Sequence, residues 1–288
     1  MTRKINNSYE LGQSNAPTDG GDMLKTRGDG TLVWEGVADT TFVPWVFQGS
    51  NYGFTSGGAI SYSNVIDRFA FSSNTTATDW GNGTVTRNEG YAGSSSTTQG
   101  FTSGGYNGTH TDIIDKFNFS SAGNASDHGD LSVARTAVAG QSSSTHGYTS
   151  GGQDPLTNTI EKFAFSSNTT ASDHGDLSQA RRYSSGQSST DYGFTSGGYT
   201  TNDSNIQTTI DKFAWSSNTT ATDHGDLNTA TMYSGGSSSS DYSFVLGGSD
   251  SDVSWTDRID KFAHSSNVTA TDHGDLSASR AYVAGCQY

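Results

Sequence analysis

An Asp-His-Gly-Asp sequence that recurs along the chain brings together the side chains best suited to chemistry. Neighbouring Asp and His side chains can bind a metal ion or exchange protons with a substrate. A catalytic site, however, needs different residues that converge on one point, whereas a group repeated in every copy forms a ring. The first copy also has Trp80 where the others have His128, His174, His224 and His273. We therefore interpret this position as a structural slot for a ring, and we predict no catalytic residue and no metal site.

A repeated arginine and a repeated acidic residue form a second set of candidate groups. The arginine occurs at Arg87, Arg135, Arg181 and Arg280, and Thr231 replaces it in one copy. The acidic residue occurs at Asp67, Asp115, Glu161, Asp211 and Asp260. A guanidinium and a carboxylate form strong paired hydrogen bonds, so each satisfies the other where both are buried. We predict structural ion pairs, either within one repeat or between neighbouring repeats.

Three markers in step divide the chain into five repeats. A glycine pair begins at positions 57, 104, 151, 197 and 247, and an Ile-acidic-basic-Phe sequence begins at positions 66, 114, 160, 210 and 259. The Asp-His-Gly-Asp sequence is the third marker. A period of about 48 residues is typical of a four-stranded β-propeller blade. The repeats lack apolar residues at helical spacing, and their glycine and β-branched content opposes a helical solenoid.

Short apolar runs within one repeat predict four strands separated by turns. In the third copy these runs cover residues 137–143, 147–150, 159–165 and 172–177, and we name the four strand positions a, b, c and d. Such strands need only a thin apolar stripe, which agrees with a hydrophobic content of 31%. The sequence therefore predicts an all-β propeller of about five four-stranded blades.

This pattern resembles the kelch family of propellers. A kelch repeat has a basic residue that opens strand a, a glycine pair that closes strand b, an acidic residue before an aromatic residue on strand c, and an aromatic residue on strand d. The third copy has Arg135, Gly151-Gly152 and Glu161-Lys162-Phe163 at the first three places, and the first copy has Trp80 at the fourth. The histidines of the other copies depart from the family. The resemblance covers residues 42–288 and implies a fold rather than a function.

The C-terminal residues repeat the beginning of strand a without the rest of a blade. Residues 280–285 (Arg-Ala-Tyr-Val-Ala-Gly) correspond to residues 135–140 (Arg-Thr-Ala-Val-Ala-Gly). The segment Phe42-Val43-Pro44-Trp45, before the first glycine pair, lacks the arginine and contains a proline, which disrupts strand pairing. We predict that the C-terminal strand completes the first blade and closes the ring. The alternative is a further blade that begins with residues 31–47.

Residues 1–41 share none of the repeat markers, so we predict a separate N-terminal β arm. Residues 22–34 have the pattern of two short strands joined by a Gly-Asp-Gly turn. This segment, with Leu24, Leu32 and Trp34, resembles the L-K-T-x-G-x-G-x-L-x-W segment of tail-fibre and other appendage proteins of tailed phages, and the whole chain resembles virion proteins of marine phages. The resemblance implies that the arm attaches to other virion proteins, with a homotrimer as one such assembly. The alternative is a hairpin that caps the propeller.

Charge and composition exclude several classes of protein. Acidic residues outnumber basic residues by 29 to 15, so the chain lacks the basic surface that binds nucleic acid. We expect no membrane insertion, because no apolar run reaches the length that spans a bilayer. We expect no signal peptide, because the N-terminus lacks an apolar segment. The single cysteine, Cys286, can form neither an intrachain disulfide nor a cysteine-based zinc site, and we predict no cofactor.

The copies differ most in the loops between strands b and c, which hold 7, 8, 7, 11 and 10 residues. We expect all five loops on one face, and function is often carried by such loops. Their aromatic, Asn and Asp side chains suit a sugar or a protein partner. We predict ligand-binding residues at Tyr106, His110, Tyr199, Asn202, Asp203, Asn205, Asp250, Asp252 and Trp255. The alternative is ordinary variation of surface loops.

Three functions fit these observations. The first is a non-enzymatic structural or appendage protein of a tailed-phage virion, such as a fibre tip, head fibre or decoration protein. It would be made in the host cytoplasm and would display the propeller to a host surface glycan or another virion protein. The second is a free-standing kelch-type interaction adaptor or a lectin. The third is a glycan hydrolase, which should show one asymmetric cluster of carboxylates. The near-identical copies favour the first function, and we predict that the chain is no enzyme.

Overall fold

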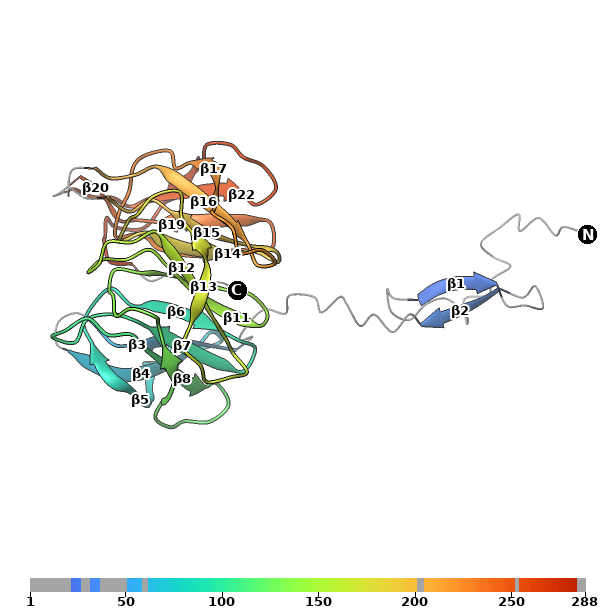
Figure 1. Cartoon of the computed structure of the whole chain (residues 1–288), viewed down its shortest axis with the longest axis horizontal. Coiled ribbons are helices and arrows are strands. Elements are labelled where there is room, and N and C mark those ends of the chain that lie inside the picture. Colours follow the sequence, from blue (N-terminus) through green and yellow to red (C-terminus); the bar gives the residue numbers. More distant parts are fainter. Residues whose placement is uncertain are drawn as a thin grey trace, which may run out of the picture. The chain divides into compact units, whose positions relative to one another are not determined.

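The computed structural model describes residues 22–26, 32–36, 51–58, 62–200, 205–251 and 254–283. Across these residues the secondary structure consists of strands, and none of them forms a helix that could span a membrane. The chain divides into two compact units, Met1–Val46 and Phe47–Tyr288 (Figure 1). The domain boundary that the sequence predicts between residues 41 and 42 lies outside the described residues.

The first unit contains the antiparallel pair β1 (Asp22–Thr26) and β2 (Leu32–Gly36), with Leu24 opposite Trp34. The two predicted strands of the arm are therefore confirmed, while the turn between them lies outside the described residues. Leu24, Leu32 and Trp34 all lie in these strands. Attachment through them stays a prediction, as does the capping alternative.

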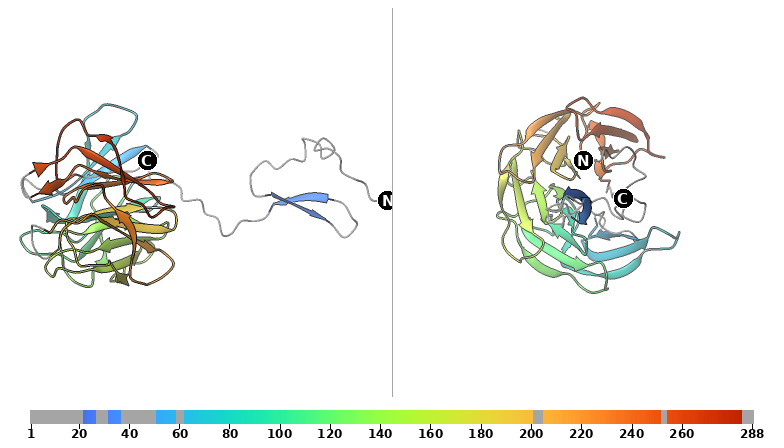
Figure 2. Two further views of the ribbon diagram at one scale, coloured as in Figure 1. Left: turned by 90° about the horizontal axis from the view of Figure 1, so that it is seen from above. Right: turned by 90° about the vertical axis from the view of Figure 1, so that its right-hand side faces the viewer.

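The second unit is a β-propeller of five antiparallel blades, which follow one another around a ring in chain order (Figure 2, right). Blade 1 contains β3 (Tyr52–Ser56), β4 (Ser63–Ala70) and β5 (Thr78–Arg87). Blade 2 contains β6 (Ala92–Ser95), β7 (Gln99–Ser103), β8 (Ile113–Asn118) and β9 (Ser126–Asp130). Blade 3 contains β10 (Ala139–Ser142), β11 (His146–Ser150), β12 (Thr159–Ala164) and β13 (Ser172–Asp176).

Blade 4 contains β14 (Ser185–Ser188), β15 (Tyr192–Ser196), β16 (Thr209–Ala214) and β17 (Thr222–Asp226). Blade 5 contains β18 (Gly235–Ser238), β19 (Tyr242–Leu246), β22 (Arg258–Ala263) and β23 (Thr271–Asp275). Its loop between strands b and c holds a short hairpin, β20 (Ser249–Ser251) and β21 (Ser254–Trp255). The prediction of an all-β propeller with about five blades is confirmed, and the four strands of blade 3 match the predicted ranges to within two residues at each end.

The apolar core lies between the blades rather than inside one thick layer. Each of the four clusters takes side chains from two neighbouring blades. Between blades 2 and 3, for example, Phe101 and Ile114 pack with Phe163 and Phe165. Equivalent clusters join blades 1 and 2, 3 and 4, and 4 and 5. Burial of one such apolar side chain stabilises the folded state by about 1.5–3 kcal/mol. A thin apolar stripe in each strand is therefore enough to hold the blades together.

The last described residues follow the path that leads from each blade to the next. The amide of Gly248 donates to the carbonyl of Arg280 at 2.8 Å, as the amide of Gly152 does to Arg181 at 3.0 Å. The amide of Tyr282 donates to the carbonyl of Tyr233 at 2.8 Å, as Tyr233 does to Tyr183 at 3.0 Å. In the earlier blades this path leads into strand a. Residues 284 and 285 of the predicted closing strand lie outside the described residues.

Candidate ligand-binding face

Three buried ion pairs join the repeated arginine, which precedes strand a, to the acidic residue on strand c of the blade that follows it. The guanidinium nitrogens lie 2.6, 2.8 and 2.7 Å from the carboxylate oxygens in the pairs Arg87–Asp115, Arg135–Glu161 and Arg181–Asp211. Each of these side chains is at most 3% exposed. The predicted structural role is confirmed for these pairs, since groups so deeply buried cannot reach a ligand.

Blade 5 keeps the same arrangement with a relocated arginine. Thr231 replaces the repeated arginine, and Arg258 on β22 supplies a guanidinium instead, with Nε 3.3 Å from Asp260 Oδ1. Arg258 Nη2 also donates to the Thr231 hydroxyl at 3.1 Å. Burial raises the pKa of Asp260, and the Arg258 charge acts in the opposite direction. Asp260 therefore also has a guanidinium beside it, although this one comes from strand c and not from the segment before strand a.

The repeated histidines occupy the aromatic slot that the sequence predicts. His128, His174 and His224 are each 1% exposed, and each Nε2 pairs with a backbone carbonyl of the next blade at 2.8–2.9 Å. Trp80 in blade 1 makes the equivalent bond, with Nε1 donating to the carbonyl of Asn118 at 2.7 Å. The His128 ring packs 4.9 Å from that of Phe101. These imidazoles join blades and are not available for acid–base chemistry.

Acid should weaken the propeller through these histidines. Burial lowers the pKa of His128, His174 and His224, and their hydrogen bonds to carbonyls only partly oppose it. Since the folded pKa lies below the ordinary value of 6.5, this stability is complete above pH 6.5 and is lost as the pH falls through the lower, folded pKa. We expect the free energy of unfolding, measured with urea, to be lower at pH 5 than at pH 7.5.

His128→Trp provides the matched test. The slot of His128 is lined by three phenylalanines, Phe101, Phe163 and Phe165. The slot of Trp80 is also lined by three phenylalanines, Phe54, Phe117 and Phe119. This variant should fold, keep a donor for the Ala164 carbonyl and show a smaller difference between the two pH values. A pH dependence equal to that of the original chain would show that His128 does not contribute to it.

Nothing in the described part of the chain forms a group of three His, Cys, Asp or Glu side chains that could hold a metal ion. Cys286 lies outside the described residues.

The loops between strands b and c lie on the same face as the segments that enter strand a. Backbone bridges join the two sets of segments at Thr136 and Gln153, at Arg182 and Tyr199, and at Met232 and Ser249. We call this surface the loop face. It is the face on which the sequence predicts ligand binding.

The predicted binding residues fall into separate groups on this face. Tyr106 and His110 lie together, with ring centroids 5.2 Å apart, and His110 Nε2 is 3.2 Å from Asp154 Oδ2. Trp255 in β21 is 62% exposed, and Asp250 is exposed as well. Three further predicted residues lie outside the described residues: Asn202, Asp203 and Asp252.

Two of the predicted residues have mainly structural contacts. Asn205 is exposed, but its Nδ2 donates to Thr200 Oγ1 at 2.8 Å and thereby stabilises its own loop. Tyr199 is only 5% exposed, since its ring packs against Tyr183, which leads into the same blade, and Tyr233, which leads into blade 5. Tyr199 is therefore buried support for a second aromatic group rather than an exposed loop residue.

That second group, which we call the tyrosine crescent, consists of Tyr183, Tyr199, Tyr233 and Tyr282. The ring centroids of Tyr183 and Tyr233 are 4.4 Å apart, and those of Tyr233 and Tyr282 are 4.3 Å apart. The Tyr199 and Tyr233 hydroxyls are 3.5 Å apart. Tyr282 is 62% exposed, so the crescent reaches from the packed interior of the loop face to solvent.

Charged groups border the crescent. The Arg182 guanidinium lies over the Tyr199 ring, 4.4 Å from its centroid, and Arg182 Nη1 donates to Gln153 Oε1. Burial raises the pKa of Tyr183 and Tyr282, and the charge of Glu89 raises both further. Burial likewise raises the pKa of Tyr233 to about 12. At neutral pH these phenols are therefore protonated and can donate hydrogen bonds.

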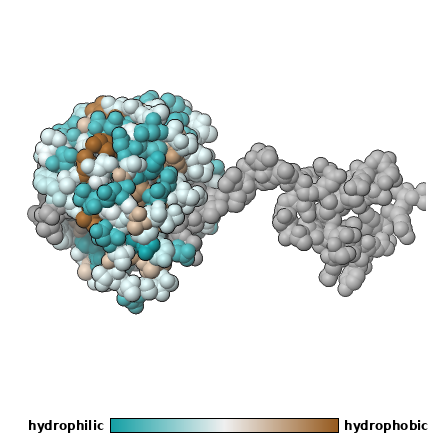
Figure 3. All heavy atoms as spheres, turned by 90° about the horizontal axis from the view of Figure 1, so that it is seen from below, coloured by the Kyte–Doolittle hydropathy of each residue, from teal (hydrophilic) through white to brown (hydrophobic). Residues whose placement is uncertain are grey.

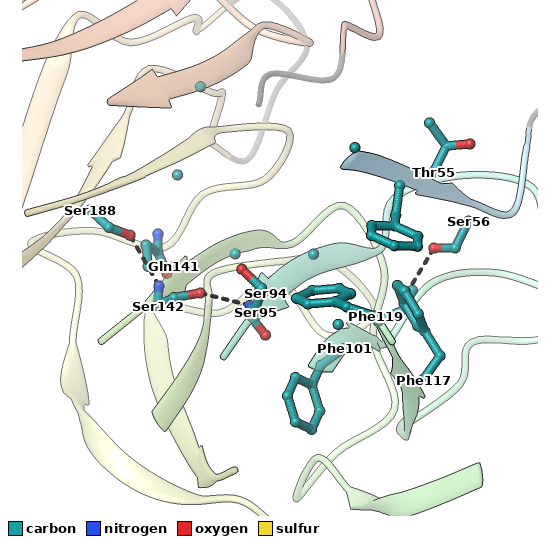
Figure 4. Close-up of a pocket in the computed structure, with 18 of the residues that line it drawn as sticks. Thr55, Ser56, Ser94, Ser95, Phe101, Phe117, Phe119, Gln141, Ser142 and Ser188 are labelled. Atoms are coloured by element: carbon teal, nitrogen blue, oxygen red, sulfur yellow. Dashed lines mark hydrogen bonds between the residues drawn. The ribbon is translucent and has the colours of Figure 1, made fainter. Parts of the chain in front are cut away.

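A groove of about 270 Å³ lies at the centre of the ring beside β3, lined by aromatic and hydroxyl side chains (Figure 4). It follows the open edge of β3: Thr55 is exposed, whereas the equivalent Thr149 and Thr195 are fully buried beneath strand a of their own blades. The groove coincides with the place of strand a in blade 1. We therefore interpret it as the seat of the closing strand rather than as a ligand pocket.

The space-filling view shows one side of the propeller as mostly hydrophilic or neutral, with a few separate hydrophobic patches (Figure 3). The side shown thus lacks the broad apolar area that marks a permanent protein interface.

A comparison with known protein families finds no family model that matches the chain. No curated protein matches it either. Proposals about function therefore rest on the residues and on the fold.

Proposed function

We propose that this chain is a non-enzymatic binding and display protein of a tailed-phage particle. In this proposal the kelch-like propeller presents its loop face to a host surface glycan or to another virion protein, and the N-terminal arm attaches the chain to the particle. The particle itself is proposed from the resemblance of the arm to phage appendage proteins.

The contacts of the repeated polar side chains support the proposal that the chain is not an enzyme. The repeated Arg and acidic side chains bond to each other in buried pairs. The repeated imidazoles bond to carbonyls of the next blade. Catalysis needs an acid, base or nucleophile within reach of a substrate, and these groups serve the fold instead.

The differences between copies support binding on one face. Tyr106 and Trp255 come from loops between strands b and c, where the copies diverge in length and composition. Tyrosine and tryptophan are the side chains that provide large contact area together with a polar group. A rigid ring with variable loops on one side is well suited to recognition.

A direct test measures binding and turnover on the same samples. The full chain is incubated with purified bacterial surface polysaccharides, and the bound chain and any released sugar are both quantified. We expect binding to at least one polysaccharide without release of sugar. Release of sugar that is lost when one carboxylate of the loop face, such as Asp250, is changed to Asn would contradict the non-enzymatic proposal.

A further inference from the structure

The three outer tyrosines of the crescent share an uncommon backbone conformation. The φ angles of Tyr183, Tyr233 and Tyr282 are 54°, 57° and 58°. A non-glycine residue in this left-handed region costs on the order of 1 kcal/mol or more. Residues held there against that cost tend to cluster at functional sites.

The turn itself does not need a tyrosine. The equivalent residue is Gly90 in blade 2, with φ of 66°, and Ala137 in blade 3, with φ of 58°. In each copy before the last, the carbonyl of this residue accepts a hydrogen bond from a backbone amide of the next turn. The amide of Val138, for example, donates to the carbonyl of Gly90 at 3.2 Å. Since Gly and Ala support the turn, the aromatic rings have a purpose other than the turn.

Two charged residues beside the crescent are also peculiar to one copy each. Arg182 stands where the other copies have Asn88, Thr136, Met232 and Ala281. Glu89 is an extra residue, since two residues separate Arg87 from Gly90 but only one separates Arg135 from Ala137. The tyrosines, the Arg182 guanidinium over Tyr199 and the Glu89 carboxylate, whose charge raises the pKa of Tyr183 and Tyr282, thus lie near one another on the loop face through changes that the repeated fold does not require.

This combination has the chemistry of a sugar site. A pyranose ring presents an apolar C–H face, which packs on an aromatic ring, and a rim of hydroxyls, which need both donors and acceptors. The phenols of the exposed Tyr282 and the half-buried Tyr183 and Tyr233 can donate, as can Arg182, and Glu89 can accept. A cationic ligand fits less well, because the Arg182 guanidinium already covers the face of Tyr199. We propose that the tyrosine crescent, with Arg182 and Glu89, binds a neutral pyranose unit of a glycan.

This inference deepens the proposed function and depends on it for the glycan. The test uses the full chain and saturation-transfer NMR with methyl glycosides of glucose, galactose, mannose and N-acetylglucosamine. The variant Tyr183→Gly with Tyr233→Gly copies the residue that blade 2 has at this position, so the turn should be kept and the chain should fold, with a lower Tm from the lost ring contacts. We expect it to bind the preferred glycoside at least about tenfold more weakly, since two aromatic contacts with the sugar are lost.

Ala137→Gly is the matched control, because it makes the same change of backbone freedom outside the crescent and should leave binding unchanged. Unchanged binding by the tyrosine variant, with binding lost in Trp255→Ala, would overturn the crescent as the site while the proposed function stood. Binding of none of the four glycosides, together with capture of a protein partner, would overturn the sugar assignment alone. Release of sugar from a bound polysaccharide would instead contradict the proposed function.

Discussion

Arg181→Ala is expected to destabilise the propeller by about 3–5 kcal/mol, because it leaves a buried carboxylate without its cation. Arg181 Nη2 lies 2.7 Å from Asp211 Oδ2 and also donates to the carbonyl of Thr195 at 2.9 Å. Asp211 accepts from the amide and the hydroxyl of Ser178, which leads into blade 4 from blade 3. Urea unfolding at neutral pH measures the loss.

Lys212→Ala is the control for this prediction. Lys212 lies on the same strand, but its ammonium group only rests over the half-exposed ring of Tyr192, 4.8 Å from the centroid. We expect its loss to cost less than about 1 kcal/mol. The double variant Arg181→Met with Asp211→Leu should be more stable than Arg181→Ala, since neither buried charge remains. If Arg181→Ala unfolds at the same urea concentration as Lys212→Ala, the pair does not hold the blade together.

Gly93→Ala tests whether the C-terminal strand closes the ring. In successive blades the glycine of strand a packs against the carbonyl of the previous one: a Cβ at Gly140 would lie 2.3 Å from the Gly93 oxygen, and one at Gly186 would lie 2.1 Å from the Gly140 oxygen. The serines that follow are joined in the same way, with the amide of Ser95 donating to Ser142 Oγ at 3.0 Å (Figure 4).

No described atom lies within 4 Å of a Cβ built at Gly93. If residues 284–287 form strand a of blade 1, the carbonyl of Gly285 takes the place that the Gly93 carbonyl has beside Gly140. We therefore expect Gly93→Ala and Gly140→Ala to destabilise alike, by about 1–3 kcal/mol or more, because a backbone atom cannot move aside. Gly123→Ala, which has open space and is exposed, should change stability little. A neutral Gly93→Ala beside a destabilising Gly140→Ala would contradict closure by this strand.

Closure of the ring by the C-terminal strand would also form the ion pair of blade 1. Asp67 has no ion pair within the described residues, and the Arg280 guanidinium donates to the nearby Ala278 carbonyl and Ser277 hydroxyl. Closure would bring Arg280 to Asp67 in the way that Arg135 meets Glu161. His273 of blade 5 is exposed, whereas its equivalents are buried between blades, so it lies at the place where blades 5 and 1 would meet.

The fold could be predicted from the sequence because it is repeated. Five copies of the glycine pair and the Ile-acidic-basic-Phe sequence fix where strands b and c lie, and the exchange of His128 for Trp80 between copies identifies a packing slot without any coordinates. The partners Arg135 and Glu161 followed from the need to neutralise two buried charges.

The arrangement of the loop face could not be predicted in the same way. Tyr183 and Tyr233 lie in equivalent turns whose left-handed φ depends on bonds to the neighbouring turn. A tyrosine in the sequence does not indicate that conformation. Tyr199 was predicted as a ligand-binding loop residue, yet it is buried, because the rings of Tyr183 and Tyr233 pack against it. The transfer of the cation from position 231 to Arg258 also depends on which side chains meet across strands. Contacts that form only in the folded chain decide all three features.

The role of the arm is best tested by light scattering after size exclusion, on the full chain and on a chain that begins near Gly49. We expect the full chain to form a trimer or to join a larger assembly, and the shortened chain to be a stable monomer. That result would support attachment through the arm and display of the propeller on a particle. Monomers in both cases would contradict attachment and would favour a free-standing lectin or adaptor.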